Sequence, residues 1–305
     1  MKKIVIAGGS GFLGETLTSY FKSKVEQIVI LTRGTPRTDT NNVQFVYWDA
    51  ENLGDWAKEI NNADALINLT GKSVDCSYTK KNKALILNSR IASTKVLGEA
   101  IKTCENSPKI WLNSSTATIY RHSLDKKMDE SHGEIGNGFS VDVAKSWEKT
   151  FFDQHTPNTR KVALRTSIVL GKKGGALPSI LNLVKIGIGG KQGKGNQKIS
   201  WIHEIDFARS IEFIINTPQI SGTINIVSPE PTTNTIFMKT LRKVTKTPIG
   251  IPLPVFLLKF GAKIIKTETE LILKSRNVIP TKLKKSGFQF NFHSLDMALS
   301  HLISK

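Results

Sequence analysis

The chain has 305 residues, of which 39% are hydrophobic and 22% charged, so it is long enough to bury one large core or two closely joined ones. No apolar run approaches the roughly 20 residues that span a bilayer, and a glycine-rich turn follows the N-terminus too early for a signal peptide. Only two cysteines are present, which excludes a disulfide framework and a cysteine-based zinc site and fits a reducing compartment. These features predict a cytoplasmic globular protein without a membrane span.

The charge is strongly basic and unevenly placed. Lys and Arg number 43 against 25 Asp and Glu, a net charge of +18, and residues 231–305 hold 13 basic but only 3 acidic side chains. A surface of this kind attracts phosphorylated ligands, nucleic acid or anionic lipid. Because no nucleic-acid fold signature accompanies the charge, we favour a solvated basic surface and predict no specific nucleic-acid partner.

Short apolar segments rich in β-branched residues alternate with helical stretches over the first 170 residues. The longest expected helix covers residues 82–103. The expected strands are residues 1–7, 27–33, 43–49, 63–71, 109–115 and 161–171. Strands that alternate with helices at this spacing predict an α/β fold with a doubly wound, parallel Rossmann sheet.

The pattern changes after Gly171. Residues 172–210 are glycine-dense, basic and irregular, and apolar residues threaded through them favour a functional loop over a disordered one. The remaining chain resembles helices punctuated by prolines. We therefore predict a Rossmann domain over residues 1–170, with returning segments at about 196–230, and a smaller, mostly helical C-terminal substrate lobe made of 171–195 and 231–305.

The stretch GGSGFLG links the first strand to the first helix and has the spacing of a dinucleotide-binding turn. Gly8 allows the tight turn, Gly11 lets the backbone approach a pyrophosphate, and Gly14 lets the helix pack on the strand. The N–H groups of the helix N-terminus then face the phosphates. The cofactor contacts expected here also include Ser10, Phe12 and Leu13.

The end of the second strand distinguishes NAD from NADP. An acid there bonds the ribose 2′-hydroxyl of NAD, whereas a cation suits the 2′-phosphate of NADP. This sequence has Thr32 and Arg33 at that place, with Arg37 nearby. The pattern favours NADP; the alternative is that Arg33 is only a solvent-facing loop residue.

Several further motifs extend over nearly the whole chain: LTRG, NLTGKSV, ILNSRIAST, NSSTATIY, LRTSIVLGKKGGALP, GTINIVSPEPTTN and SGFQF. Together with the glycine turn, they resemble the extended short-chain dehydrogenase/reductase superfamily. The resemblance is closer to its atypical epimerase-family branch, which carries a C-terminal domain of unknown function. It implies a Rossmann fold and an NAD(P) cofactor.

The resemblance also assigns roles to single residues. Asp49 resembles the acid that contacts adenine, and Thr116, flanked by Ser114 and Ser115, falls on the catalytic Ser or Thr of the superfamily. Asn88 and Arg90 lie in the helix whose equivalents line the cofactor cleft, although a solvated helix surface explains Asn88 equally well. Further cofactor contacts implied here are Leu69, Thr70, Gly71, Ser114 and Arg165.

The superfamily's catalytic Tyr-x-x-x-Lys pair is missing from its expected place. Tyr20 and Lys24 match the pattern, but they lie in the first helix and point away from the nicotinamide, so we interpret them as a packing tyrosine and a solvated lysine. Counting from Thr116 puts the pair at Val141 and Lys145, and aligning the following Trp-Glu puts it at Ser140 and Ala144. Tyr120 and Lys145 are therefore the candidate replacements, with a packed aromatic as the alternative for Tyr120.

The glycine-dense segment offers amides and cations to an anionic or polyhydroxylated small molecule. Its candidate substrate contacts are Lys191, Gln192, Lys194, Gln197, Trp201 and His203. His203 resembles a position that braces the loop on the sheet rather than one that catalyses. The histidines show no ligand spacing, so we predict no metal site.

Three functions compete at this point. The first is an NADP-dependent oxidoreductase or epimerase-like enzyme for a small polar substrate such as a nucleotide sugar, which the polar loop favours. The second is a non-catalytic NADP-binding redox sensor or regulator, which the missing tyrosine favours. The third is a binder of nucleic acid or membrane surfaces, which only the charge favours. The sequence is compatible with an oligomer and does not identify one.

Overall fold

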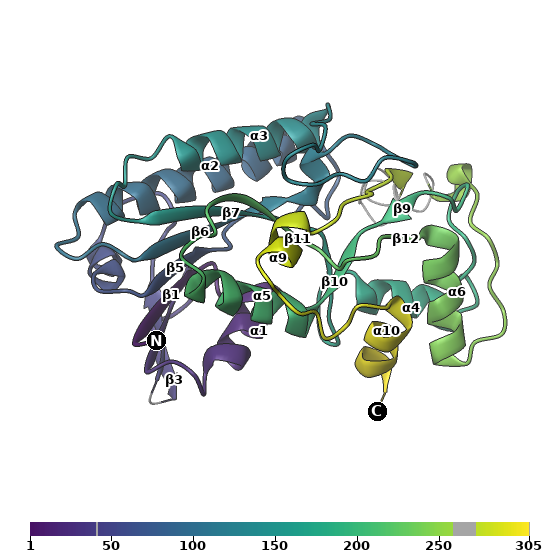
Figure 1. Cartoon of the computed structure of the whole chain (residues 1–305), viewed down its shortest axis with the longest axis horizontal. Coiled ribbons are helices and arrows are strands. Elements are labelled where there is room, and N and C mark those ends of the chain that lie inside the picture. The colour runs from purple at the N-terminus through teal and green to yellow at the C-terminus, as the bar shows by residue number, and fades with distance from the viewer. Residues whose placement is uncertain (41, 259–272, 305) are drawn as a thin grey trace.

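The computed structural model describes residues 1–40, 42–258 and 273–304. Its centre is an eight-stranded sheet in the order β11-β7-β6-β5-β1-β2-β4-β3, covered by helices on both faces (Figure 1). All neighbours pair in parallel except the edge strand β3, which runs antiparallel to β4 and was not expected. The strands are β1 (Lys3–Ala7), β2 (Gln27–Thr32), β3 (Arg37–Thr40), β4 (Val43–Tyr47), β5 (Ala65–Asn68), β6 (Ile110–Thr116), β7 (Arg160–Thr166) and β11 (Gly222–Ile226). The predicted parallel Rossmann sheet is confirmed.

The central strands are continuous apolar runs because helices bury both of their faces. In β1, Ile4 and Ile6 join the core on the side of α1 (Phe12–Phe21) and α5 (Glu204–Asn216). Val5 and Ala7 join the core on the opposite side. That opposite face is covered by η1 (Asp55–Ile60), α2 (Lys80–Lys102) and α3 (Phe139–Phe152). The last two helices lie above the sheet in Figure 1.

The sheet changes winding direction between β1 and β5. β1 continues through α1 to β2 on one side, whereas β5 continues through α2 to β6 on the other. In such sheets a crevice opens beyond the carboxyl ends of the two strands where the direction reverses. The glycine turn after Ala7 and the turn after Asn68 therefore border the same crevice.

The C-terminal lobe lies beside the sheet and is built mainly from helices (Figure 1). Its core combines Phe237, Leu241 and Leu299 with Trp201, which comes from the segment predicted to return to the Rossmann domain. The predicted strand over residues 161–171 is in fact two strands, because the chain leaves the main sheet after β7. The elements beyond the main sheet are η2 (Ala117–Ile119), β8 (Ile168–Leu170), α4 (Leu177–Lys185), β9 (Lys198–Ile199), β10 (Trp201–His203), β12 (Thr232–Thr233), α6 (Asn234–Thr245), α9 (Thr281–Lys285) and α10 (Leu295–Ile303). Among the described residues, no helix combines the length and apolar character needed to cross a bilayer.

Residues 172–210, which the sequence suggested to be mostly irregular, contain α4 together with β9, β10 and the start of α5. Pro178 lies at the start of α4, where its missing N–H costs no helical hydrogen bond. Leu177 and Val184 of this helix are buried in the lobe core. The apolar residues threaded through the segment therefore serve packing.

His203, at the end of β10, links the C-terminal helix α10 to the start of α5. Its Nδ1 accepts the Ile205 N–H at 3.0 Å and so caps α5, its Nε2 lies 3.1 Å from Nδ1 of His301, and its ring stacks on Phe292 at 3.7 Å between centroids. The side chain is fully buried, and this burial lowers the pKa of His203 to about 3, with a smaller contribution from His301. His203 therefore has the bracing role that the sequence favoured.

We expect His203 to make stability depend on pH. The unfolded state binds a proton below pH 6.5 while the folded state resists protonation down to about 3, so stability is fully present above 6.5 and falls as the pH falls through this window. The slope is at most ~1.4 kcal/mol per pH unit. Denaturant unfolding between pH 7 and pH 5 measures it. His203→Asn, which retains a capping acceptor, should flatten the slope, whereas the exposed control His293→Asn should retain it. Equal slopes in all three proteins would contradict this assignment.

Candidate functional site

The glycine turn has the geometry that a dinucleotide requires. Gly8 has a φ of +73°, and a Cβ there would lie 3.0 Å from Cα of Thr70 across the crevice. A Cβ on Gly14 would lie 2.2 Å from the carbonyl oxygen of Gly9, so only glycine lets α1 approach the turn this closely. A Cβ on Gly11 would meet nothing within 4 Å. Backbone therefore borders open space at the position where the sequence predicts a pyrophosphate.

The N-terminus of α1 carries no side-chain cap, so its first N–H groups have no partner from a capping residue. Ser10 is exposed beside it, and Leu13 is half-buried against the sheet core. Phe12 packs on the loop after β8, since a Cβ at Gly171 would lie 2.3 Å from its ring. The helix end thus favours a bound anion, while the ring of Phe12 holds the C-terminal loop against it.

At the end of β2, Thr32 is buried and its Oγ1 accepts the N–H of Gly34 at 3.2 Å. The following Arg33 is exposed and forms no hydrogen bond or ion pair within the described ranges. Arg37 is different, because it pairs with Asp39 at 2.8 Å and lies over the ring of Phe45. Arg33 is therefore the uncommitted cation of the two that the sequence singled out.

Asp49 follows β4, but its carboxylate is occupied by its own turn. Its Oδ1 accepts the N–H groups of Glu51 and Asn52, each at 2.8 Å, and its Oδ2 accepts the side-chain amide of Asn52. These bonds, first that from the Asn52 backbone, lower the pKa of Asp49. The predicted adenine contact would have to share oxygens that already hold the turn.

The turn after β5 is held in place by hydrogen bonds of a buried asparagine. Asn68 is fully buried, donates to Asn113 at 2.7 Å and accepts the Thr70 N–H at 3.0 Å. The hydroxyl of Thr70 is buried and has no hydrogen-bond partner among the described residues. Leu69 is half-buried, and a Cβ on Gly71 would lie 2.9 Å from the guanidinium carbon of Arg90. The three predicted residues of this turn therefore lie between the glycine turn and α2.

Thr116 lies at the end of β6, two strands from the glycine turn. Its Oγ1 accepts the N–H of Thr118 at 3.1 Å, which holds the oxygen in place and leaves the O–H able to donate. Ser114 is half-buried and has the same pleat position as Thr116, whereas Ser115 points to the opposite face and donates to Glu148 at 2.6 Å.

Arg165 is committed to a buried ion pair rather than to an open cleft. Its Nε and Nη2 each lie 2.8 Å from an oxygen of Glu148, and its Nη1 donates to the phenol oxygen of Tyr120 at 2.9 Å. Both charged side chains are about nine-tenths buried. Burial alone lowers the pKa of Arg165, but the bonds to Glu148 outweigh it and raise that pKa. The structure thus does not support Arg165 as a cofactor contact.

Tyr120 completes this cluster and is 1% exposed. Its hydroxyl donates to Asn225 at 2.9 Å while accepting from Arg165. Burial raises the pKa of the Tyr120 phenol, the opposite of what a proton donor at neutral pH needs. The placement corresponds to the packed aromatic alternative rather than to a replacement catalytic phenol.

Both alignments of the missing pair lead to α3. Val141 and Ala144 are fully buried in one apolar cluster with Ala117, next to Thr116. Ser140 has a buried hydroxyl without a partner among the described residues. Lys145 is exposed on the same helix, and Asn88 is exposed on α2. Of the four aligned positions, only Lys145 carries a charged side chain, and that side chain is exposed.

Tyr20 and Lys24 belong to the other face of the sheet. Both bond Glu212 of α5, at 2.5 and 2.9 Å, and Lys24 also donates to the Tyr20 hydroxyl. Burial and the Glu212 contact raise the pKa of Tyr20, whereas a catalytic lysine should lower it. The tyrosine does pack, but the lysine is ion-paired rather than simply solvated.

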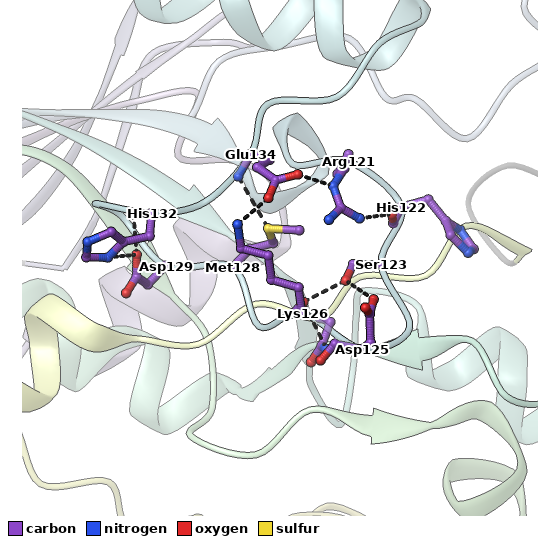
Figure 2. Close-up of polar contacts among 10 residues, drawn as sticks. Arg121, His122, Ser123, Asp125, Lys126, Met128, Asp129, His132 and Glu134 are labelled. Atoms are coloured by element: carbon purple, nitrogen blue, oxygen red, sulfur yellow. Dashed lines mark hydrogen bonds and ion pairs between the residues drawn. The ribbon is translucent and has the colours of Figure 1, made fainter.

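The connection between η2 and α3 contains a polar cluster that the sequence did not single out (Figure 2). Arg121 and Lys126 both bond Glu134, and the main-chain N–H groups of Ser131 and His132 donate to Asp129. The sequence signal that could have revealed this cluster is the closeness of oppositely charged residues between Arg121 and Glu134. The connection is held against residues 273–279, where the Met128 N–H donates to the carbonyl oxygen of Asn277 at 2.7 Å.

Three of the predicted substrate contacts lie inside the lobe. Gln192 and Gln197 are 6% and 4% exposed, and the Gln197 amide donates to the Gln192 carbonyl oxygen. Gln192 also exchanges hydrogen bonds with Asn234, and Trp201 is 1% exposed. Because the three side chains are buried and the two glutamines are hydrogen-bonded within the protein, the structure does not support them as substrate contacts. Lys191 is exposed, and no group of metal-ligating side chains occurs in the described part of the chain.

Comparison with known proteins identifies the relatives of this chain. A model described as the NAD dependent epimerase/dehydratase family matches residues 4–227, and one described as a domain of unknown function (DUF1731) matches residues 253–302. The epimerase family protein YfhF of Bacillus subtilis is 34% identical over 301 residues, covering 99% of this chain and 98% of its own.

Two solved structures are similar throughout this chain. Human epimerase family protein SDR39U1 with NADPH has a TM-score of 0.86 and 26% identity, and 99% of each chain is covered. A nucleoside-diphosphate sugar epimerase from Corynebacterium glutamicum has a TM-score of 0.79 and 26% identity, covering 99% of this chain and 58% of that one. These findings confirm the resemblance drawn from the motifs.

The buried pair predicts a large stability effect. Glu148→Gln leaves the Arg165 charge buried without its counter-charge, which should cost about 3 to 5 kcal/mol of unfolding free energy. Asp153→Asn at the C-cap of the same helix breaks the exposed pair with Lys149 and should cost less than about 1 kcal/mol. Denaturant titrations of both variants measure the difference. Similar losses in the two would show that the pair does not hold this region together.

Proposed function

The chain belongs to the NAD-dependent epimerase/dehydratase family, and on that basis we propose that it is an NADPH-dependent oxidoreductase or epimerase-like enzyme. Its substrate in this proposal is a small polar molecule of the nucleotide-sugar class. Three kinds of observation support it: the cofactor crevice, a positioned hydroxyl and the named relatives.

The residues at the end of β2 are the main reason for proposing NADP rather than NAD. Arg33 is exposed there without a partner in the described part of the chain, while its neighbour Arg37 is paired with Asp39. No carboxylate stands at Thr32 or Arg33 to bond a ribose 2′-hydroxyl. Open space at Gly11 and the uncapped N-terminus of α1 suit the pyrophosphate of the same cofactor.

The cofactor, when bound, supplies hydride exchange at its nicotinamide ring. In our proposal Thr116 donates its O–H to the substrate oxygen next to the carbon that exchanges hydride, while Thr118 holds the Thr116 oxygen. A threonine hydroxyl is too weak an acid to supply the proton at neutral pH. With Tyr120 committed to Asn225 and Arg165, Lys145 is the predicted group left to exchange protons with solvent.

The nucleotide-sugar class rests on a relative and on charge. The Corynebacterium neighbour is a nucleoside-diphosphate sugar epimerase at 26% identity. The basic C-terminal part of this chain, with Lys191 exposed in the adjoining segment, suits a ligand that carries phosphates.

A non-catalytic NADP-binding sensor is the alternative. The missing tyrosine is the feature that favours it, but the family and its named relatives do not. Hydride transfer separates the two, because a sensor would bind NADPH and leave it unoxidised with every ketone, enone and nucleotide-sugar substrate offered.

We expect Arg33→Ala to abolish most of the preference for NADPH over NADH. Loss of a charge-assisted contact of roughly 1.5 to 3 kcal/mol corresponds to a 10- to 150-fold weaker NADPH affinity. Calorimetric titration with both cofactors measures it. The control Arg37→Ala should change neither affinity by more than about threefold, since Arg37 is paired elsewhere. Equal affinities of the unaltered protein for NADPH and NADH would reject the assignment.

We expect Thr116→Val to lower the rate of NADPH oxidation about 10²- to 10³-fold, the usual effect of losing a donor to a reacting oxygen. Stopped-flow absorbance of NADPH with a panel of carbonyl compounds and nucleotide sugars measures it. Thr118→Val retains the backbone N–H that bonds Thr116 and should leave the rate nearly unchanged. Full activity in Thr116→Val would place the substrate oxygen elsewhere.

A further inference from the structure

Two segments of the C-terminal lobe pair through their backbones at its outer edge. Residues 187–193 follow α4, and residues 251–253 belong to the chain that leaves α6 and runs along the right-hand edge in Figure 1. The Ile251 N–H donates to the carbonyl oxygen of Gly187 at 2.9 Å, and the Gly190 N–H donates to that of Ile251 at 3.1 Å. This edge is therefore a defined surface of the lobe with a backbone held by hydrogen bonds.

Large aliphatic side chains are exposed on this surface. Ile186, Ile249 and Ile251 are 68%, 62% and 58% exposed. All three lie around Gly187: Ile186 precedes it, Ile251 bonds its carbonyl oxygen, and a Cβ on it would lie 3.7 Å from Cγ2 of Ile249. A single exposed isoleucine is ordinary, but a group of them on one surface is typical of a site that contacts a partner.

The charged groups in these parts of the sequence are all cations. Residues 172–203 and 231–258 contain 6 and 4 Lys and Arg side chains, respectively, and no Asp or Glu. Lys185 precedes Ile186, and Lys246 lies three residues before Ile249. Both lysines are exposed, and neither forms an ion pair with the described residues. The three isoleucines and these two lysines thus form one surface, which we call the apolar–basic surface.

The charge favours an anionic partner, and the apolar side chains indicate which kind. Proteins that bind single-stranded nucleic acid offer aromatic side chains for base stacking, whereas the exposed side chains here are aliphatic. A second copy docked on the same surface about a twofold axis would bring Lys185 and Lys246 of both copies together, which is unfavourable. A membrane with anionic lipids offers phosphates to the lysines and acyl chains to the isoleucines.

We propose that the apolar–basic surface docks the protein on membranes that contain anionic lipids. Ile186, Ile249 and Ile251 enter the boundary between headgroups and acyl chains, while Lys185 and Lys246 contact lipid phosphates. The attachment is peripheral and reversible, because three side chains bury little apolar area. It is separate from the proposed NADPH site, whose residues come from the glycine turn and from the ends of β2, β5 and β6.

The first test uses the full chain and two kinds of unilamellar vesicle, one of phosphatidylcholine alone and one of phosphatidylcholine and phosphatidylglycerol in equal amounts. Co-sedimentation should show binding to the anionic vesicles only, and added salt should weaken it. Combining Lys185→Gln with Lys246→Gln should weaken binding about 30-fold, the effect expected of two lysines at an anionic surface. The control pair, Lys22→Gln with Lys102→Gln, lowers the net charge equally at exposed positions of the Rossmann domain and should change binding less than about threefold.

A second pair of variants tests the apolar contribution. Ile249→Ser combined with Ile251→Ser should weaken binding to the anionic vesicles at least about tenfold, because less apolar area enters the membrane. Its control, Leu53→Ser with Leu124→Ser, alters exposed leucines outside the surface and should leave binding unchanged. All of these variants change exposed side chains, so thermal unfolding should be nearly that of the unaltered protein.

Failure to bind the anionic vesicles would overturn the proposal, as would equal binding to phosphatidylcholine alone. Equal losses in the two lysine variants would overturn it by showing that only net charge matters. Full binding in the isoleucine variant would also overturn it, because the surface would then contact charge without entering the membrane. If the isoleucine variant instead lowered self-association in analytical ultracentrifugation while vesicles remained unbound, the surface would be an interface between copies. Calorimetry with NADPH tests the proposed function separately, so the two proposals can fail independently.

Discussion

The buried ion pair between Glu148 and Arg165 is the constraint on which the arrangement of the site depends. It joins α3 to β7, and through Ser115 and Tyr120 it also reaches β6 and the chain after it. An isolated buried charge is unfavourable, so each member requires the other and the surrounding hydrogen bonds. The pair therefore sets the distance of α3 from the sheet, and with it the position of Val141, Ala144 and Lys145 relative to Thr116.

The same pair changes the chemistry available in the cleft. By residue type, Arg165 and Tyr120 are suited to anion binding and to catalysis. Both are instead hydrogen-bonded inside the protein, to each other and, respectively, to Glu148 and Asn225. Of the candidate groups, Thr116, Lys145 and the backbone of the glycine turn remain available. Because Tyr120 is committed to Asn225 and Arg165, our proposal assigns proton exchange at this site to solvent or to Lys145.

Much of this architecture could be predicted from local patterns. The strand–turn–helix at residues 3–21 has apolar β-branched residues, glycines at the required spacing and an amphipathic helix, and each signal depends only on near neighbours. The edge strand β3 was missed, because Arg37–Thr40 is polar and short and forms a strand only by pairing with β4. The break between β7 and β8 was also missed, because an unbroken apolar run does not reveal that its second half pairs with β10 in a different sheet.

The sequence by itself determined the α/β class, the dinucleotide turn and the absence of the usual tyrosine, since these follow from residue identity and from spacing along the chain. Only the tertiary structure decided which polar residues remain available. Gln192, Gln197 and Trp201 are buried in the folded protein. Arg165 pairs with Glu148, 17 residues away in the sequence. Tyr20 and Lys24 both bond Glu212, which is nearly 200 residues away. Whether a charge is free or paired depends on what the fold brings within about 4 Å of it. That information lies in contacts between distant segments, which is why the exposed Arg33 could be told apart from the buried, paired Arg165 only in three dimensions.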